Sequence, residues 1–470
     1  MRRFTYRARG TAATLLVAVG CTLLGACDPK HELLEPQQPG PISPSSVNNP
    51  TGADGEYVGT IGRLNNAMNG GGGNLEGLWQ EEGLFSDEVK STDTFSQRND
   101  ADQRNLQTFD TDLRDIYRKV QQVRGHARVA INGLLAYDKS QTGILHVAEM
   151  YMVMGYTEMQ LSSVFCNGIP FGETVDGVPQ YTAPITDADG SKLAITRFDS
   201  ALTYIAAIPT TPALTTAQKA AIEQVKNAAL VAKARAQVDL ADFAGAAATV
   251  ASVPTGFQYA LNYSQSSGFD NEWWVMGPNV LRYSAGDSVD ITGQVLNAIP
   301  FAHLNDPRVP VEDLHKPAED LQSDFVQIKI WGRDDPVAML TGTDARLIEA
   351  EAKLQAGDVA GVMNILNSLR ATPQTFGVFK PTAMPPLPSP ADNTALTDLF
   401  FREKALWQFG RGFRMDDLRR LVRQYHRSQD KVFPSGNFMR GGQYGSQTNF
   451  PVPDDERTNT LFTGCMDTSP

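Results

Sequence analysis

Hydrophobic residues recur at helical spacing along much of the chain. Val359, Val362, Met363 and Leu366 stand at positions i, i+3, i+4 and i+7, which line one face of an α-helix. Similar stripes occur near residues 113–127, 148–159, 198–205 and 396–407. Long stretches without this pattern separate them, at 70–107, 168–191, 257–327 and 373–393. The pattern predicts an all-α protein with long irregular segments between its helices.

Two segments of the chain match each other at an offset of 116 residues. They run from Ala229 to Val253 and from Ala345 to Leu369, and they share alanine, aspartate and glycine at six positions. Each segment predicts a helix, a short turn and a second helix. In the second copy, Gly357 would end one helix and Asp358 would cap the next. This pattern is typical of tetratricopeptide-like pairs, which stack so that each buries its neighbour's apolar face. We therefore expect a tetratricopeptide-like helical-repeat body with a large loop-rich subdomain.

The first 26 residues have the pattern of a secretory signal peptide. Four arginines precede an almost uncharged apolar run, Thr11–Ala26. A helix of about 16 residues spans roughly 24 Å, which is shorter than the ~30 Å core of a bilayer. The run ends in Leu24-Gly25-Ala26-Cys27, which resembles the lipobox of bacterial lipoproteins. We expect Cys27 to carry lipid, and the alternative is an ordinary signal peptide with an incidental cysteine.

The segment after Cys27 predicts a tether. Glycine, proline, serine, glutamine and asparagine dominate residues 36–52, a composition typical of flexible linkers. The expected organisation is a signal peptide at 1–26, a lipidated tether at 27–52 and a folded domain at 53–470. Loop-rich insertions are expected in that domain at about 257–327 and 371–393.

The four cysteines divide into three roles. Cys21 lies in the signal peptide and Cys27 is the expected lipidation site, so Cys166 and Cys465 remain. Disulfides persist in the oxidising compartments that secreted proteins enter. We predict a disulfide between Cys166 and Cys465, and the alternative is two free thiols.

The charge balance excludes a nucleic-acid partner. The 470 residues contain 41 Lys+Arg and 53 Asp+Glu, a formal net charge of -12. Loss of the signal peptide removes four arginines and no acid, which lowers the charge to -16. Binding to phosphates requires clusters of basic residues. The hydrophobic fraction of 41% is ordinary for a folded protein.

The sequence contains no recognisable catalytic or metal-binding motif. The six histidines never fall within four residues of each other, and there is no Gly-x-Ser-x-Gly elbow. The glycine run at 70–73 lacks the lysine of a phosphate-binding loop. Asp187 and Asp189 with Gly190 only faintly resemble a calcium loop, because the glycine is misplaced. We therefore predict no enzyme activity, no metal and no cofactor.

Three tryptophans are candidate ligand contacts. Trp273 and Trp274 are adjacent in a long irregular segment, and Trp79 follows the glycine run. A flat indole matches the apolar face of a sugar ring, while nearby polar groups fix its orientation. The alternative is that these tryptophans anchor loops onto the helical core.

A series of short motifs follows in order along the mature chain. They are Cys166–Phe171, Asp306-Pro307-Arg308, Arg346–Ala352, Arg402-Glu403 with Arg411–Arg419, and Phe450–Glu456. Together they resemble the SusD/RagB family of surface lipoproteins, with Arg411 at a position where the family has glutamate. The charged residues of Arg411–Arg419 are expected to form ion pairs between the last helices.

The resemblance implies a partner and a location. A protein of this family would lie on the cell surface, anchored by lipid in the outer membrane. It would capture nutrient for a SusC-type TonB-dependent transporter and would catalyse nothing itself. The ligand would be an oligosaccharide or, alternatively, a peptide. A helical-repeat scaffold of a surface complex, with no small ligand, also stays open.

Overall fold

The computed structural model describes residues 48–71, 76–175, 178–287 and 297–470. The predicted signal peptide, Cys27 and most of the expected tether lie outside the described residues. The first described helix, α4, begins at Pro50, so residues 50–52 of the expected tether are helical. Proline suits the first position of a helix because its missing N–H would have no partner there.

Helices make up most of the described chain. They are α4 (Pro50–Asn69), α5 (Leu78–Phe85), α6 (Ser96–Asp102), α7 (Thr111–Tyr137), α8 (Gln141–Val164), α9 (Asp187–Ala206), α10 (Thr216–Asp239), α11 (Phe243–Val250), α12 (Glu272–Trp274), α13 (Gly342–Gln355), α14 (Val359–Ala371), α15 (Asn393–Gln408) and α16 (Arg414–Arg423). Short helical turns are η2 (Gln265–Ser267), η3 (Val275–Asn279), η4 (Gln429–Lys431) and η5 (Asp454–Thr458). The all-α prediction is confirmed.

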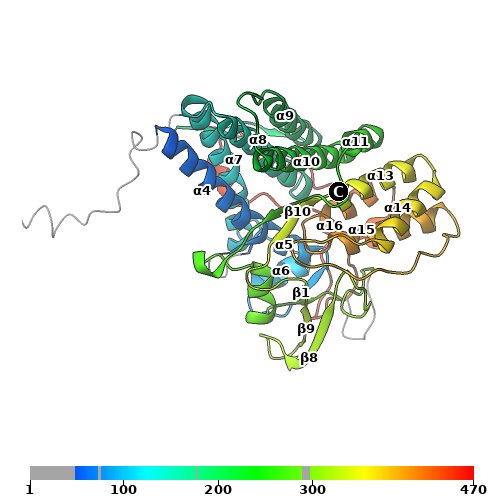
Figure 1. Ribbon diagram of the computed structural model, residues 1–470. Coiled ribbons are helices and arrows are strands. Elements are labelled where there is room, and N and C mark those ends of the chain that lie inside the picture. The colour runs from blue at the N-terminus through cyan, green and yellow to red at the C-terminus, as the bar shows by residue number, and fades with distance from the viewer. Residues whose placement is uncertain (1–47, 72–75, 176–177, 288–296) are drawn as a thin grey trace, which may run out of the picture. The chain divides into compact units, whose positions relative to one another are not determined.

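The long helices stack in the order of the chain. From α7 to α11 each helix contacts the next, α4 contacts α7, and α11 contacts α13, which pairs with α14. Figure 1 shows this succession across the upper part of the body, with α5, α6 and the short strands below it. Such nearest-neighbour stacking lets each helix pair bury the apolar face of the one before it.

The matched segments form the predicted helix pairs, α10–α11 and α13–α14. Their turns have the same hydrogen bonds at an offset of 116 residues: the amide of Asp242 donates to Gln237 and that of Asp358 to Lys353. The side chains of Asp242 and Asp358 then cap the following helices by accepting from the amides of Gly245 and Gly361. The predicted helix pairs and the predicted cap at Asp358 are therefore confirmed.

The two turns differ at one position, which gives a prediction. Gly357 has φ +73°, and its counterpart Ala241 has φ +60°. The left-handed conformation costs a non-glycine residue about 1–2 kcal/mol, partly offset because glycine has more freedom in the unfolded chain. We expect Ala241→Gly to raise the free energy of unfolding by about 0.5–1 kcal/mol and Gly357→Ala to lower it similarly. Chemical denaturation of both variants measures this, and a loss of stability in both would contradict it.

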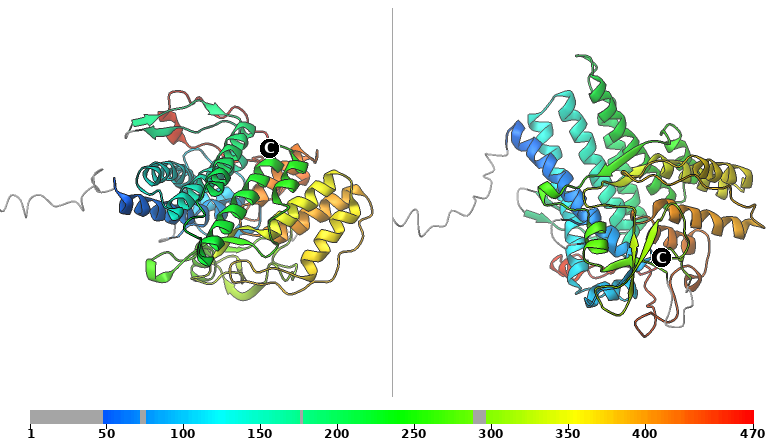
Figure 2. Two further views of the ribbon diagram at one scale, coloured as in Figure 1. Left: turned by 45° about the horizontal axis from the view of Figure 1, so that its top comes forward. Right: turned by 60° about the horizontal axis from the view of Figure 1, so that its bottom comes forward.

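Short antiparallel strand pairs form the loop-rich part. They are β1 (Val89–Ser91) with β7 (Tyr283–Ala285), β2 (Ile169–Pro170) with β5 (Pro184–Ile185), β3 (Glu173–Val175) with β4 (Val178–Gln180), β6 (Gln258–Leu261) with β10 (Val337–Thr341), and β8 (Val311–Pro317) with β9 (Asp324–Ile328). The β8–β9 hairpin projects from the lower part of Figure 1, and Figure 2 shows the same pairs from two further sides.

The long segments without helical spacing are only partly irregular. The segment between α14 and α15 contains neither helix nor strand. The stretch at 70–107 was predicted to be irregular, but it contains α5, β1 and α6. Helix α5 is buried along its whole length, including Gln80, Glu81 and Glu82. These buried polar residues interrupt the apolar spacing that would have revealed the helix.

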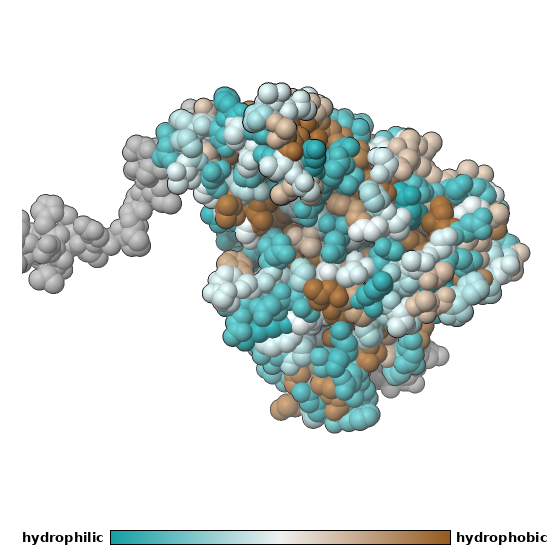
Figure 3. All heavy atoms as spheres, in the orientation of Figure 1, coloured by the Kyte–Doolittle hydropathy of each residue, from teal (hydrophilic) through white to brown (hydrophobic). Residues whose placement is uncertain are grey.

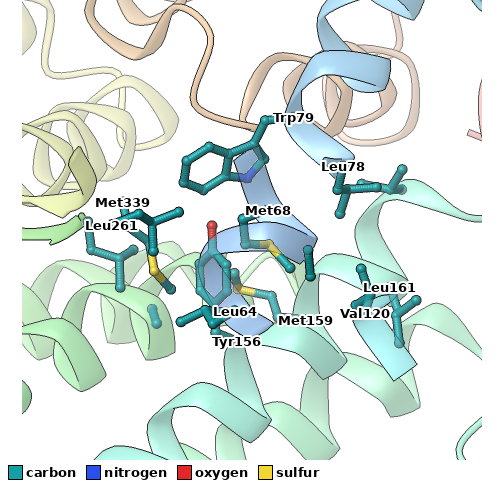
Figure 4. Close-up of a cluster of buried hydrophobic side chains, with 14 of the residues drawn as sticks. Leu64, Met68, Leu78, Trp79, Val120, Tyr156, Met159, Leu161, Leu261 and Met339 are labelled. Carbon is teal, nitrogen blue, oxygen red and sulfur yellow. The ribbon is translucent and has the colours of Figure 1, made fainter. Parts of the chain in front are cut away.

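Helices α7 and α8 contribute long buried faces to the core. The predicted stripe of α7, which includes Leu113, Ile116 and Val120, is buried, and α8 is buried along nearly all of its second half. Figure 4 shows Met159 and Tyr156 of α8 facing Leu64 and Met68 of α4. The methionine-rich stripe therefore belongs to the core.

Asp417 of α16 binds Lys404 of α15 at 2.7 Å, an ion pair between the last helices as predicted. Arg411 and Arg419 pair with earlier helices instead. Arg411 binds Asp344 at the start of α13 at 2.6 Å, and Arg419 binds Asp187 at the start of α9 at 2.8 Å. At the centre lies Glu351 of α13, which is fully buried. Its carboxylate binds Arg420 at 2.5 Å and Lys404 at 3.1 Å.

The predicted disulfide is present. Cys166, directly after α8, is bonded to Cys465 in the C-terminal tail across a sequence separation of 299 residues. The amide of Cys166 also donates to the carbonyl of Phe450, and that of Met466 to Asn167. The bond therefore closes a chain loop that spans most of the body.

We expect reduction of this disulfide to destabilise the protein. A crosslink across a long loop restricts the unfolded chain and is typically worth about 2–4 kcal/mol. Removal of both thiols by Cys166→Ser and Cys465→Ser should lower the melting temperature, and a reductant should then change nothing further. Differential scanning calorimetry with and without reductant checks this. An unchanged wild-type melt after mass spectrometry has confirmed full reduction would contradict it.

No helix in the described part of the chain is both long and apolar enough to cross a membrane.

Candidate ligand-binding surface

Trp79 lies in the core. It is the second residue of α5 and has no exposed surface. In Figure 4 its indole points between Met68 and Met339. The turn between α15 and α16 closes on this ring: a Cβ on Gly412 would lie 2.0 Å from the Cδ1 atom of Trp79. Trp79 therefore offers no ring face to a ligand.

Trp273 is also buried, at 4% exposure. Its Nε1 donates to the carbonyl of Gly410 at 3.0 Å, and its ring stacks on Trp331 with centroids 5.4 Å apart. Phe409 continues the stack beyond Trp331 at 6.4 Å. Trp273 anchors its loop to the helical core, which is the alternative interpretation of this residue.

Trp274 is the one tryptophan of the five that is not buried. The guanidinium of Arg333 lies 5.1 Å from its ring centroid. Asp270 holds that guanidinium in place with two hydrogen bonds of 3.0 Å. The exposed polar residues 265–268 belong to the same loop. Of the three tryptophans predicted to contact a ligand, Trp274 is therefore the one whose indole is partly exposed.

A second exposed apolar site is formed by two other loops. Phe95 at the start of α6 is 43% exposed, and Leu321 between β8 and β9 is 80% exposed. The amide of Asp320 donates to the carbonyl of Thr92 at 3.0 Å, which brings the two loops together. Sequence analysis missed both residues because each is a single apolar residue within a polar stretch. We call Phe95, Leu321, Arg282 and Arg440 the Phe95–Leu321 surface.

Hydrogen bonds connect this surface to the segment that follows Trp274. After η3, the carbonyl of Leu281 accepts from the hydroxyl of Thr92 at 3.0 Å and from the amide of Glu319 at 3.1 Å. The segment between Trp274 and Leu281 is kinked at Gly277 and contains Pro278. These hydrogen bonds therefore attach the Phe95–Leu321 surface to a position seven residues after Trp274 in the chain.

The charged groups of the Phe95–Leu321 surface are paired. Arg440 binds Asp320 at 2.6 Å, and Arg282 lies 3.4 Å from Asp93. Burial raises the pKa of Asp320, but hydrogen bonds from Ser323 and Gln322 outweigh burial and lower that pKa overall. The surface therefore presents fixed, neutralised ion pairs beside apolar side chains, which suits an uncharged polar ligand.

Two acids with strongly raised pKa values are buried rather than exposed on this surface. Burial raises the pKa of Glu88 to about 8 and that of Asp102 to about 7. Both are almost completely buried around α5, so a substrate cannot reach them. Raised pKa values are common at catalytic sites, but buried ionic networks produce them as well.

No group of three or more metal-ligating side chains among the described residues is arranged to hold a metal ion. The faintly calcium-like residues begin α9. Thr186 caps this helix, Asp187 binds Arg419, and Asp189 binds Lys192.

On the face of the molecule in Figure 3, hydrophobic residues form small separate groups among hydrophilic ones.

Comparisons with known proteins relate the chain to one group of solved structures. No family model matches the sequence, and no curated protein matches it. A SusD superfamily protein from Bacteroides vulgatus is 13% identical, with a TM-score of 0.60 over 88% of this chain and 98% of its own. A SusD-like carbohydrate-binding protein from the same species is 12% identical, with a TM-score of 0.58 over 87% and 97%.

A laminarin-binding SusD-like protein is 14% identical, with a TM-score of 0.62 over 89% of this chain and 99% of its own. The likeness spans nearly the whole length of each of these structures. It shows that the chain has the SusD fold, as the motifs implied.

Proposed function

We propose that this chain, which has the SusD fold, is a member of the SusD/RagB family that captures an oligosaccharide at the cell surface. It is anchored in the outer membrane by lipid on Cys27 and hands its ligand to a SusC-type TonB-dependent transporter. It performs no catalysis. The observation that carries the proposal is Trp274, a partly exposed indole clamped by an Arg333–Asp270 pair on a fold whose solved examples include carbohydrate-binding proteins.

The physical basis is the match between the surface and a neutral sugar. An indole held by an arginine keeps its position without a ligand, so little conformational freedom is lost on binding. The Phe95–Leu321 surface, bonded to the chain seven residues after Trp274, offers a second apolar contact. A ligand made of several linked sugar rings would contact both.

A peptide is the second candidate ligand. Leu321 is an exposed aliphatic side chain next to the Arg440–Asp320 ion pair, and it suits an apolar residue of a peptide. The peptide would occupy the same surface, so the two candidates differ in ligand class alone.

A binding screen distinguishes these candidates. Residues 28–470, purified without lipid, are titrated by calorimetry with laminarin, other β-glucans, α-glucans and a pool of short peptides. The proposal expects saturable binding of at least one oligosaccharide class. Binding of peptides alone would support the second candidate, and no binding of either class would leave the scaffold alternative. Co-purification from native membranes tests the transporter partnership, and a monomer there would count against it.

A further inference from the structure

The surroundings of Trp274 carry more negative than positive charge. Trp274 ends α12, and the guanidinium of Arg333 lies against its ring. Asp270 already pairs with this guanidinium: Nε and Nη2 each donate to one of its carboxylate oxygens at 3.0 Å. Asp334 and Asp335 follow Arg333 directly in the chain. Two further carboxylates therefore stand beside an arginine that is already neutralised.

Hydrogen bonds hold these acids beside the helix of Trp274. Asn271 caps α12, and its amide donates to the carbonyl of Arg333 at 2.9 Å. The side chain of Asn271 donates to the carbonyl of Asp335 at 2.8 Å. The turn at residues 332–335 is therefore bonded at two positions to the residue that begins this helix. Its charges have a fixed place relative to the indole ring.

The two further carboxylates accept from backbone amides. The carboxylate of Asp334 accepts from the amide of Gln265 at 2.5 Å, and that of Asp335 accepts from the amide of Gly332 at 2.6 Å. Within the described residues, neither carboxylate forms an ion pair, and Asp334 is exposed. A neutral amide orients a carboxylate but carries no charge that would cancel it. We call Asp334 and Asp335 the acidic turn.

The titration of two neighbouring groups agrees with this charge balance. The hydrogen bonds to Asp270 are the main cause that raises the pKa of Arg333, and the charge of Asp334 raises that pKa further. Asp334 therefore acts on the guanidinium that lies against the ring. Glu272 has no exposed surface, and burial raises its pKa to about 8, so it is uncharged at neutral pH. One cation and three carboxylates thus remain around Trp274.

We propose that the acidic turn makes Trp274 selective for uncharged sugars and excludes sugars that carry carboxylate or sulfate groups. This inference rests on the proposed function, because it names the ligand class of the same site. An acidic group on a sugar ring at Trp274 would meet two uncompensated like charges. The one arginine that could bind it is occupied by Asp270. Repulsion of the wrong ligand is as effective for specificity as attraction of the right one.

The exclusion should depend on salt. Coulomb's law in water gives about a two- to threefold loss of affinity for each like charge about 7 Å away. At low ionic strength the screening length is ~30 Å, and both carboxylates of the acidic turn contribute. At 1 M salt it is ~3 Å, and the exclusion disappears. A rejection caused by the shape of the site would not change with salt.

Fluorescence quenching tests the charge at Trp274 without any sugar. The other four tryptophans are buried, so solutes reach mainly Trp274, and Trp274→Phe identifies its signal. Residues 28–470 are titrated with uncharged acrylamide and with iodide. Asp334→Asn removes one charge but keeps an oxygen for the amide of Gln265. The control, Glu223→Gln, removes one charge from an exposed pair on α10.

We expect iodide to quench Trp274 less efficiently than acrylamide does, with free tryptophan amide as the reference. Asp334→Asn should raise quenching by iodide about twofold at low salt and leave quenching by acrylamide unchanged. Glu223→Gln should behave as the wild-type chain. Equal iodide quenching in the wild-type chain and in Asp334→Asn would overturn the proposal.

Calorimetry tests the consequence for sugars. The neutral glucans of the binding screen, laminarin first, are compared with the same glucans oxidised to carboxylates at C6. At low salt the oxidised form should bind at least about threefold more weakly, and both Asp334→Asn and 1 M salt should narrow this difference. Equal or tighter binding of the oxidised form, or a difference that salt does not change, would contradict the proposal. If no glucan binds in either form, the proposed function fails, while the iodide result still decides whether the acidic turn repels anions.

Discussion

Replacement of Glu351 by alanine should lower the free energy of unfolding by about 3–5 kcal/mol. Glu351 is fully buried between Arg420 and Lys404, which are themselves 1% and 5% exposed. Its carboxylate also accepts from the hydroxyl of Tyr425 at 2.9 Å. Removal of one member of a buried ion pair leaves the partner charges without compensation, and that loss has the stated size. Urea denaturation of the purified variant measures it.

Glu349, on the same helix, provides the matched control. Its side chain is 21% exposed and binds Arg346 at 3.0 Å. A partly exposed pair of this kind is worth about 0–1 kcal/mol, so Glu349→Ala should change little. Equal effects of the two substitutions would show that the buried network is not the source of the stability.

The effect of Glu351 should also depend on pH. Burial alone would raise its pKa, but Arg420 and Lys404 outweigh burial and lower it from 4.5 to about 2. A carboxyl whose folded pKa is depressed stabilises the protein above its unfolded pKa, and this contribution is lost as the pH falls towards the folded value. The difference in stability between wild type and Glu351→Ala should therefore shrink from pH 4.5 downwards. Thermal melts across this range test it, and a constant difference would contradict it.

Gly412→Ala should be the second strongly destabilising change, by about 1.5–4 kcal/mol. Gly412 has φ +69°, which should cost alanine about 0.5–1 kcal/mol net, as at Gly357. The added methyl group would also lie 2.0 Å from Cδ1 and 2.3 Å from Nε1 of the buried Trp79. Because the core around Trp79 is closely packed, the displaced ring costs a further ~1–3 kcal/mol.

Gly357 separates these two contributions. Its φ of +73° is nearly the same, but a Cβ there would meet no atom within 4 Å. Gly357→Ala should therefore show the backbone cost alone, and its difference from Gly412→Ala in chemical denaturation gives the cost of displacing Trp79. Equal losses at the two glycines would show that Trp79 is not closely packed.

Local patterns in the sequence predicted the local parts of this structure. The turn at Gly357–Asp358 depends on residues within a few positions, so its glycine and its capping aspartate were visible in the sequence. The disulfide followed from the fate of the other two cysteines and needed no geometry. The motif order implied the SusD fold, and the structural comparison bears this out.

Contacts between distant segments were not predictable. The burial of Trp79 depends on Gly412, which lies 333 residues further along the chain. The burial of Trp273 depends on Gly410 and Trp331 in the same way. An isolated tryptophan in an irregular segment carries no local sign of which glycine will close on it. The exposure of Phe95 and Leu321 was not predicted either, because it depends on how distant loops pack against each other.

The most direct test of the account is a calorimetric titration with the oligosaccharide found in the binding screen. Residues 28–470 are compared as wild type, as Trp274→Ala and as Phe109→Ala, in which a different exposed aromatic residue is removed. We predict that Trp274→Ala weakens binding at least tenfold, about 1.4 kcal/mol, while Phe109→Ala has wild-type affinity. Wild-type affinity in Trp274→Ala, or no bound oligosaccharide in the whole screen, would contradict the proposal that this protein captures sugars at Trp274.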